Sequence, residues 1–184
     1  MKTLVIYTSQ TGFTKKYADW ISARLNADVL TVREAKKKKR EFYNQYSAIL
    51  YGGWAMAGGV VGTKWFLKEA SEWKDKKLAV FCVGGSPEAN PDVEVSLSKL
   101  LTEEQKTYIR AFYCQGGLDY SRMKMPSKLA MRALVSALSK KKDASQKEKD
   151  MAEMLSHSYD ISDEKYIDPI VQYIEGGINE KTQE

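Results

Sequence analysis

The stretch Tyr7-Thr-Ser-Gln-Thr-Gly-Phe-Thr14 joins a short apolar run, residues 3–7, to a segment with helical spacing, residues 12–25. A short run of apolar and β-branched residues is typical of a strand that is buried on both faces. The apolar side chains of the second segment recur at the spacing of an amphipathic helix. The chain is therefore expected to open with a strand, a loop and a helix.

The loop carries four hydroxyl side chains and no carboxylate: Thr8, Ser9, Thr11 and Thr14. A phosphate monoester at a helix N-terminus needs unpaired backbone N–H groups, short side-chain donors and no competing anion. Gly12 permits a tight turn around the oxygens. The alternative is that Ser and Thr only cap the helix, but the loop has more hydroxyls than capping requires. Neither Gly-x-Gly-x-x-Gly nor Gly-Lys-Ser/Thr occurs in it, which argues against a dinucleotide site and a nucleoside triphosphatase.

Strand-like runs and helical segments alternate along the rest of the chain. Further strands are predicted at residues 29–32, 48–51, 78–83 and 109–114, and further helices at 61–73, 93–100, 102–107, 126–138 and 163–175. This alternation predicts a three-layer α/β fold, in which helices cover both faces of a five-stranded parallel sheet. The length of 184 residues fits a single domain, residues 1–184, with an insertion at about 119–162.

Three of the predicted strands end in a glycine pair: Gly52-Gly53, Gly84-Gly85 and Gly116-Gly117. In open α/β sheets, ligands bind beyond the carboxyl ends of the strands, and glycine lets the backbone approach them closely. The alternative is that these pairs only make tight turns. Three pairs at one edge favour a ligand site.

Thr11-Gly12-Phe13-Thr14 resembles the Thr-Gly-x-Thr phosphate loop of flavodoxins, which bind FMN at a topological switch point of the sheet. The resemblance implies the strand order 2-1-3-4-5, with Ser9 to Thr14 around the phosphate. It further implies that the loops Gly53–Gly58 and Val83–Glu88 flank the isoalloxazine ring. The cofactor-binding residues expected on this basis are Thr8, Ser9, Gln10, Thr11, Gly12, Phe13, Thr14, Gly53, Trp54, Ala55, Met56, Ala57, Gly58, Val83, Gly84 and Gly85.

Trp54 is the natural residue to stack on a flavin, because an indole offers a large flat apolar face. An ordinary surface or core tryptophan is the alternative. The third loop, Val83–Glu88, departs from the flavodoxin pattern, since no Tyr or Trp stands next to its glycines; the second loop is Gly53–Gly58. One face of the flavin is therefore expected to be open or covered by another element.

The predicted insertion and the residues just before it resemble one particular group of flavodoxin-like proteins. Gln115-Gly-Gly-Leu-Asp-Tyr-Ser-Arg122, followed by a Met- and Leu-rich helix to residue 138, is similar to the flavodoxin-type protoporphyrinogen dehydrogenases. That resemblance implies FMN, quinone reduction and contact with the inner face of the membrane. Residues 126–138 either pack on the domain or lie in a bilayer interface. Residues 139–150 are expected to form a loop or an exposed helix.

Composition and charge argue against several other classes of protein and of site. No apolar run is long enough to cross a membrane, and no signal peptide is recognised, so a cytoplasmic protein is expected, with peripheral membrane contact as an alternative. Cys82 and Cys114 do not make a metal site by themselves, and His157 lies in a polar stretch. The net charge is +5, and Lys36-Lys-Lys-Lys-Arg40 is the longest basic run. It has no interleaved aromatic residues, so nucleic acid is not an expected partner.

Two functions remain open. The first is an FMN-dependent oxidoreductase that acts on a quinone or planar substrate held between the third loop and the insertion. The sequence indicates no catalytic acid or base, because the cofactor itself can run electron or hydride transfer. The second is an electron-transfer module without a substrate of its own, which docks to a redox partner protein through its basic surface.

Overall fold

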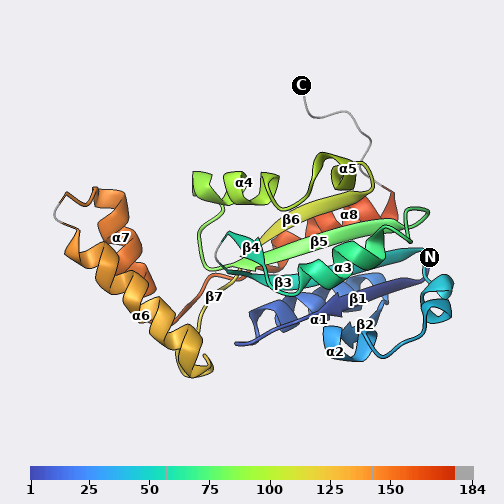
Figure 1. Ribbon diagram of the computed structural model, residues 1–184, viewed down its shortest axis with the longest axis horizontal. Coiled ribbons are helices and arrows are strands. Elements are labelled where there is room, and N and C mark those ends of the chain that lie inside the picture. The colour runs from blue at the N-terminus through green and yellow to red at the C-terminus, as the bar shows by residue number, and fades with distance from the viewer. Residues whose placement is uncertain (57, 142, 177–184) are drawn as a thin grey trace.

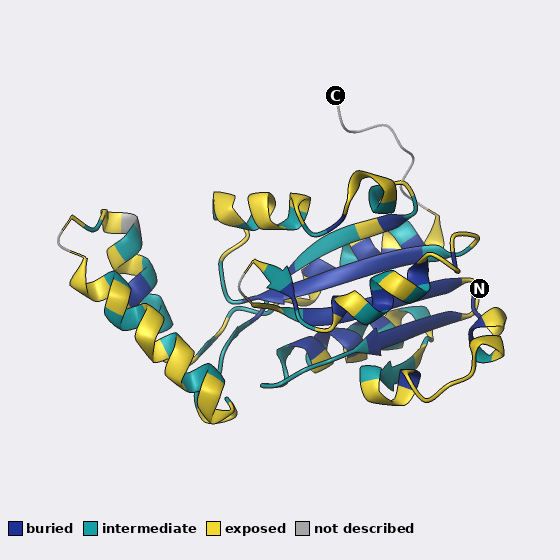
Figure 2. Ribbon diagram, viewed as in Figure 1, coloured by how far each residue is buried: buried dark blue, intermediate teal, exposed yellow. Residues whose placement is uncertain are grey.

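The computed structural model describes residues 1–56, 58–141 and 143–176. Its centre is a sheet of parallel strands in the order β2-β1-β3-β5-β6, which confirms the predicted fold and strand order (Figure 1). These strands are β1 (Thr3–Tyr7), β2 (Asp28–Thr31), β3 (Ala48–Met56), β5 (Lys77–Gly84) and β6 (Ile109–Gln115). The central strands are buried on both faces, as their apolar runs predict (Figure 2).

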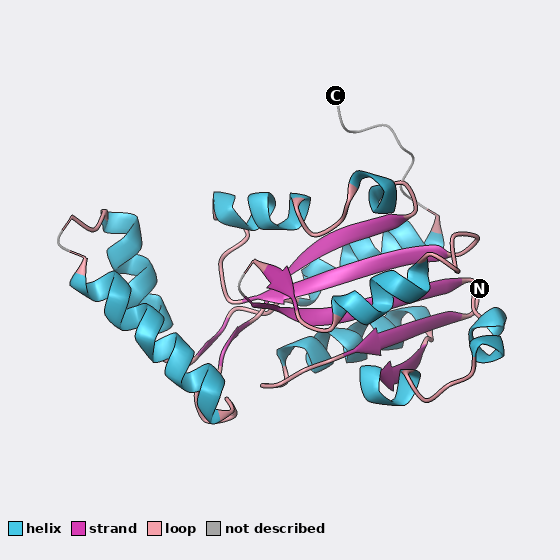
Figure 3. Ribbon diagram, viewed as in Figure 1, coloured by secondary structure: helices cyan, strands magenta, loops and turns pink. Residues whose placement is uncertain are grey.

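Helices cover the two faces of the sheet unequally (Figure 3). One face packs against α1 (Phe13–Leu25), the 3₁₀ turn η2 (Glu164–Ile167) and α8 (Asp168–Glu175), with Tyr17, Ile21 and Ile170 buried there. The other face packs against the shorter elements α2 (Val32–Ala35), η1 (Arg40–Gln45), α3 (Thr63–Ala70), α4 (Pro91–Ser98) and α5 (Glu103–Lys106). The predicted helix at 163–175 is thus a 3₁₀ turn followed by an α-helix.

Strand β3 continues past the glycine pair at which we expected it to end. It runs to Met56 and turns back as β4 (Gly59–Val60), which pairs antiparallel with it. The glycines mark close packing: a side chain on Gly52 would collide with the ring of Phe81, its partner in register on β5. A Cβ on Gly53 would lie 2.5 Å from the carbonyl oxygen of Val61.

The insertion is a helical hairpin on a short two-stranded stem. The stem pairs β7 (Gly117–Leu118) antiparallel with β8 (Tyr159–Asp160). Helices α6 (Met125–Lys140) and α7 (Gln146–Leu155) pack against each other and project from the end of the sheet (Figure 1). Of the two alternatives for residues 126–138, the structure shows packing, with α7 as the main partner, and contact with a bilayer interface stays a prediction.

Local signals explain where the second hairpin helix begins. Ser145 and Glu148 form a reciprocal capping box, and Lys141 pairs with Glu148 at 2.6 Å. Residues 146–150, expected as a loop or exposed helix, are the first turn and a half of α7. Within the described residues, no helix combines the length and the apolar character that a bilayer crossing needs.

Candidate functional site

Helix α1 begins without a side-chain cap. Gly12 is its N-cap residue, with a left-handed φ of 106°, and Ser9 Oγ accepts from the Gly12 N–H at 3.1 Å. Among the described residues, no side chain bonds to the first-turn N–H groups, so the alternative that the hydroxyls merely cap the helix is not what the structure shows. These N–H groups have no partner within the helix either, and the helix dipole makes the position favourable for an anion.

A hollow of about 380 Å³ opens beside this helix start, and we call it the loop hollow. Its charged lining residues are Lys15, Arg33 and Arg122, and none of the described carboxylates lines it. The full lining is Tyr7, Thr8, Ser9, Gln10, Thr11, Gly12, Lys15, Thr31, Val32, Arg33 and Arg122. Hydroxyls, backbone N–H groups and cations together fit the phosphate of FMN, which carries up to about two negative charges at neutral pH.

The structure brings only the first part of the predicted loop to this hollow. Phe13 packs instead on the stem of the insertion, where a Cβ on Gly117 would lie 2.9 Å from its Cζ. Thr14 is 1% exposed and does not line the hollow. Thr8 to Gly12 are therefore the residues that can meet a ligand directly, and a contact from Thr14 stays a prediction.

A second hollow of about 380 Å³ lies beyond the ends of β3 and β5, and we call it the apolar hollow. The predicted second and third loops both reach it, through Ala55, Met56, Gly58, Gly84 and Gly85. Helix α4 and the hairpin complete its walls; the other lining residues are Gly59, Val60, Cys82, Ser86, Asp92, Val93, Ser96, Leu97, Leu100, Tyr113, Leu118, Met131, Leu134, Met151 and Leu155. The predicted residue Ala57 lies outside the described residues.

Besides Phe13 and Thr14, three more of the predicted residues line neither hollow. Val83 is buried in β5, and Gly53 packs against the β4 turn. Trp54 is half-buried, and strand alternation places it on the α1 face of the sheet, because Leu50 belongs to the core on that side. Stacking of Trp54 on a flavin stays a prediction.

Two tyrosines support the third loop from elsewhere in the chain. The Tyr113 hydroxyl donates to the Ser86 carbonyl at 2.7 Å, and the Tyr159 hydroxyl donates to the Gly85 carbonyl at 2.8 Å. Burial raises the pKa of Tyr159 to about 12, so this hydroxyl remains a donor at neutral pH. The loop therefore has aromatic neighbours, although none stands beside its glycines in the sequence. Tyr159 lies 74 residues from Gly85, and no local pattern could have connected them.

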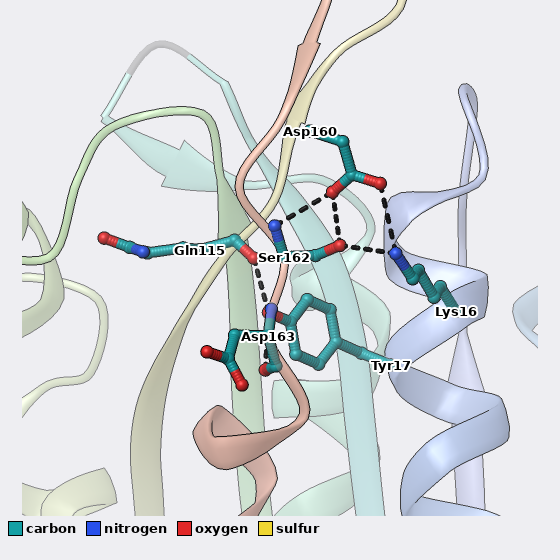
Figure 4. Close-up of polar contacts among 6 residues, drawn as sticks. All are labelled: Lys16, Tyr17, Gln115, Asp160, Ser162 and Asp163. Atoms are coloured by element: carbon teal, nitrogen blue, oxygen red, sulfur yellow. Dashed lines mark hydrogen bonds and ion pairs between the residues drawn. The ribbon is translucent and has the colours of Figure 1, made fainter.

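Strand β8 of the stem and the residues after it are joined to α1 by an ion pair and hydrogen bonds (Figure 4). Lys16 Nζ lies 3.1 Å from the Asp160 carboxylate and donates to Ser162 Oγ at 2.7 Å. The buried Tyr17 hydroxyl donates to the Gln115 carbonyl and accepts from the Asp163 N–H at 3.1 Å. The helix that starts at the loop hollow thus also positions the entry and exit of the insertion.

Cys82 is the one thiol among the described residues that line the apolar hollow. Burial raises the pKa of its thiol to about 12, which keeps it protonated and unreactive at neutral pH. Cys114 is also buried, and both cysteines are free thiols.

A family model and several solved structures are similar to this chain. A family model described as a flavodoxin domain matches residues 4–145. Similar solved structures include a flavodoxin, WrbA-like protein from Agrobacterium tumefaciens, with 20% identity and a TM-score of 0.47 over 69% of this chain and 87% of that one. A flavoprotein from Lactobacillus acidophilus in complex with FMN has 17% identity and a TM-score of 0.42, over 62% and 91% of the two chains.

A two-electron reduced flavodoxin from Megasphaera elsdenii has 19% identity and a TM-score of 0.42, over 60% of this chain and 82% of that one. No curated protein sequence matches the chain. The family match covers most of the chain, from β1 into the α6–α7 connection, and it includes the loop from Thr8 to Gly12 that lines the loop hollow. The chain belongs to the flavodoxin domain family.

Proposed function

We propose that this protein binds one FMN and passes electrons between it and a quinone or another planar apolar substrate. The observation that carries the proposal is the pairing of two hollows at the carboxyl edge of one sheet. The loop hollow is cationic and rich in hydroxyls, as a phosphate requires, and the apolar hollow is bordered by both loops that would flank the ring. Open α/β sheets bind ligands at this edge.

The residues of the chain have distinct tasks in this proposal. Thr8 to Gly12 and the start of α1 would hold the phosphate, and Lys15 and Arg33 would neutralise its charge. Ala55, Met56 and Gly85 would border the ring and keep water from it. Bound FMN would supply one- or two-electron transfer, and no side chain is then needed as an acid or base.

The hairpin makes an enzyme the better supported function. Met131 and Leu134 of α6, with Met151 and Leu155 of α7, form the outer wall of the apolar hollow opposite the third loop. A thioether- and leucine-lined wall is adaptable and suits a flat apolar molecule. A quinone fits this description, as does a porphyrinogen of the kind that protoporphyrinogen dehydrogenases oxidise.

The hairpin also offers a surface for peripheral contact with a membrane, in which quinones dissolve. Met125 and Leu129 are 64% and 57% exposed on α6, and they follow each other by one helical turn. Lys128 and Arg132 lie nearby on the same helix, where they would meet anionic head groups. Co-sedimentation with anionic but not with neutral lipid vesicles would support this placement.

The second candidate is an electron carrier that docks to a protein. Lys36 to Arg40 form an exposed basic segment after α2, which suits an acidic partner. Stopped-flow mixing of the photoreduced, FMN-loaded protein with a short-chain quinone under anaerobic conditions separates the candidates. A substrate site predicts an oxidation rate that saturates with quinone concentration. A strictly linear dependence would favour the carrier.

A further inference from the structure

The head group of Arg122 lies beside the loop hollow, although its backbone belongs to the base of the hairpin. A Cβ on Gly12 would lie 3.2 Å from Nη1 of Arg122, and Arg122 lines the hollow together with Thr8 to Gly12. Glycine at position 12 therefore does two things. It adopts the left-handed φ of 106°, and it leaves the guanidinium room to approach the loop.

Asp119 holds Arg122 in this place through both of its oxygens. Oδ1 accepts from the Ser121 N–H at 2.9 Å and from the Arg122 N–H at 3.2 Å, and Oδ2 lies 3.4 Å from Arg122 Nε. The hydrogen bond from the Ser121 hydroxyl lowers the pKa of Asp119, so the carboxylate stays charged. The Arg122 side chain is 70% exposed, and an exposed ion pair contributes little by itself. Asp119 thus orients Nε and leaves the terminal N–H groups for another partner.

We propose that Arg122 is a further phosphate-binding residue, which reaches the FMN phosphate from the insertion side of the loop hollow. This inference rests on the proposed function, because it takes FMN as the occupant of that hollow. A guanidinium can donate two parallel hydrogen bonds to phosphate oxygens, a geometry that an ammonium does not offer. It would add a directed cation to a loop that otherwise supplies hydroxyls and backbone N–H groups.

The position of Arg122 also links the cofactor to the insertion. The segment that carries Arg122 leads from the stem strand β7 directly into α6. The stem contacts Phe13, which follows Gly12 in the loop, and the ion pair between Lys16 and Asp160 fastens its other strand to α1. Binding of phosphate by Arg122 would therefore stabilise the base of the hairpin that walls the apolar hollow.

The test compares Arg122→Gln with Arg132→Gln, which removes the same charge from the same hairpin outside the loop hollow. Affinities for FMN and for riboflavin, which lacks the phosphate, are measured by quenching of flavin fluorescence. Arg122→Gln should weaken FMN binding about tenfold, equivalent to about 1.4 kcal/mol, and change riboflavin binding less than about twofold. Arg132→Gln should change neither affinity. Arg122→Lys should recover only part of the loss.

The possible failures are distinguishable. If the unaltered protein binds FMN tightly and Arg122→Gln binds it equally well, the role of Arg122 is wrong and the proposed function stands. If Arg122→Gln weakens FMN and riboflavin by the same factor, Arg122 supports the fold of the site and does not bind phosphate. If the unaltered protein binds no FMN, the proposed function itself fails.

Discussion

Replacing Tyr17 with Phe tests how the insertion is fastened to the first helix. The side chain is fully buried, and its hydroxyl joins the carbonyl of Gln115, at the end of β6, to the N–H of Asp163, which follows the insertion. Phe fills the same space, so no cavity forms. The loss is that of two hydrogen bonds whose protein partners are left in a partly buried place. An unsatisfied buried group costs about 1–3 kcal/mol, and partial access of water at Asp163 places the expected total at about 2 kcal/mol.

This destabilisation can be measured by urea or thermal unfolding followed by circular dichroism. For a chain of this length, about 2 kcal/mol corresponds to a fall in Tm of about 4–8 °C. Tyr108→Phe is the matched control. Tyr108 is half-buried under the Lys74 ammonium, and this contact uses the ring and not the hydroxyl. The free energy of unfolding should therefore change by less than about 0.5 kcal/mol. Equal stability of Tyr17→Phe and the unaltered protein would refute the role assigned to the hydroxyl.

Four further predictions concern residues at or near the edge of the sheet. Gly62→Ala should lower the free energy of unfolding in urea by about 3 kcal/mol or more. Gly62 has a φ of 84°, and a Cβ there would collide with the Tyr51 hydroxyl. Unchanged stability would show that the Tyr51 side chain can move away without cost. Leu134→Glu should raise the quinone concentration needed for half-maximal oxidation at least about tenfold without altering FMN affinity, since Leu134 lines the apolar hollow and not the loop hollow. Cys82 should react with a thiol reagent at pH 8 at least about tenfold more slowly in the native protein than in urea. The reason is that burial raises the pKa of its thiol to about 12, and the thiolate is the reactive form. Rapid labelling of the native protein would contradict the burial of Cys82. The same shift predicts that stability falls as pH rises from about 9, the ordinary thiol value, towards 12, because the unfolded chain loses this proton first.

The sequence was sufficient for the fold because its signals are local. The run from Thr3 to Tyr7 is apolar on both faces, and the same holds for the core of β5, so both are recognisable as central parallel strands. One strand end was predicted wrongly because of a glycine pair. Gly52-Gly53 resembled the end of a strand, whereas both residues lie inside β3 and make room for Phe81 and the β4 turn.

The site was predicted less completely because its walls come from distant segments. Thr8 to Gly12 are contiguous, and their chemistry can be read directly from the loop. Arg122 reaches that loop only because the stem folds back over Phe13, and no local rule connects positions so far apart in the chain. The hairpin helices show a similar limit. Their apolar faces were recognisable, but only the tertiary structure shows that α6 and α7 pack on each other and wall the apolar hollow.

The most direct test of the central claim is a pair of titrations of the purified, flavin-free protein with FMN and with riboflavin, followed by flavin fluorescence. If the loop hollow binds the phosphate through several charge-assisted hydrogen bonds, FMN should bind at least about 100-fold more tightly than riboflavin. Equal affinities for the two flavins, or no binding of either, would contradict the claim that the loop from Thr8 to Gly12 is a phosphate site for FMN.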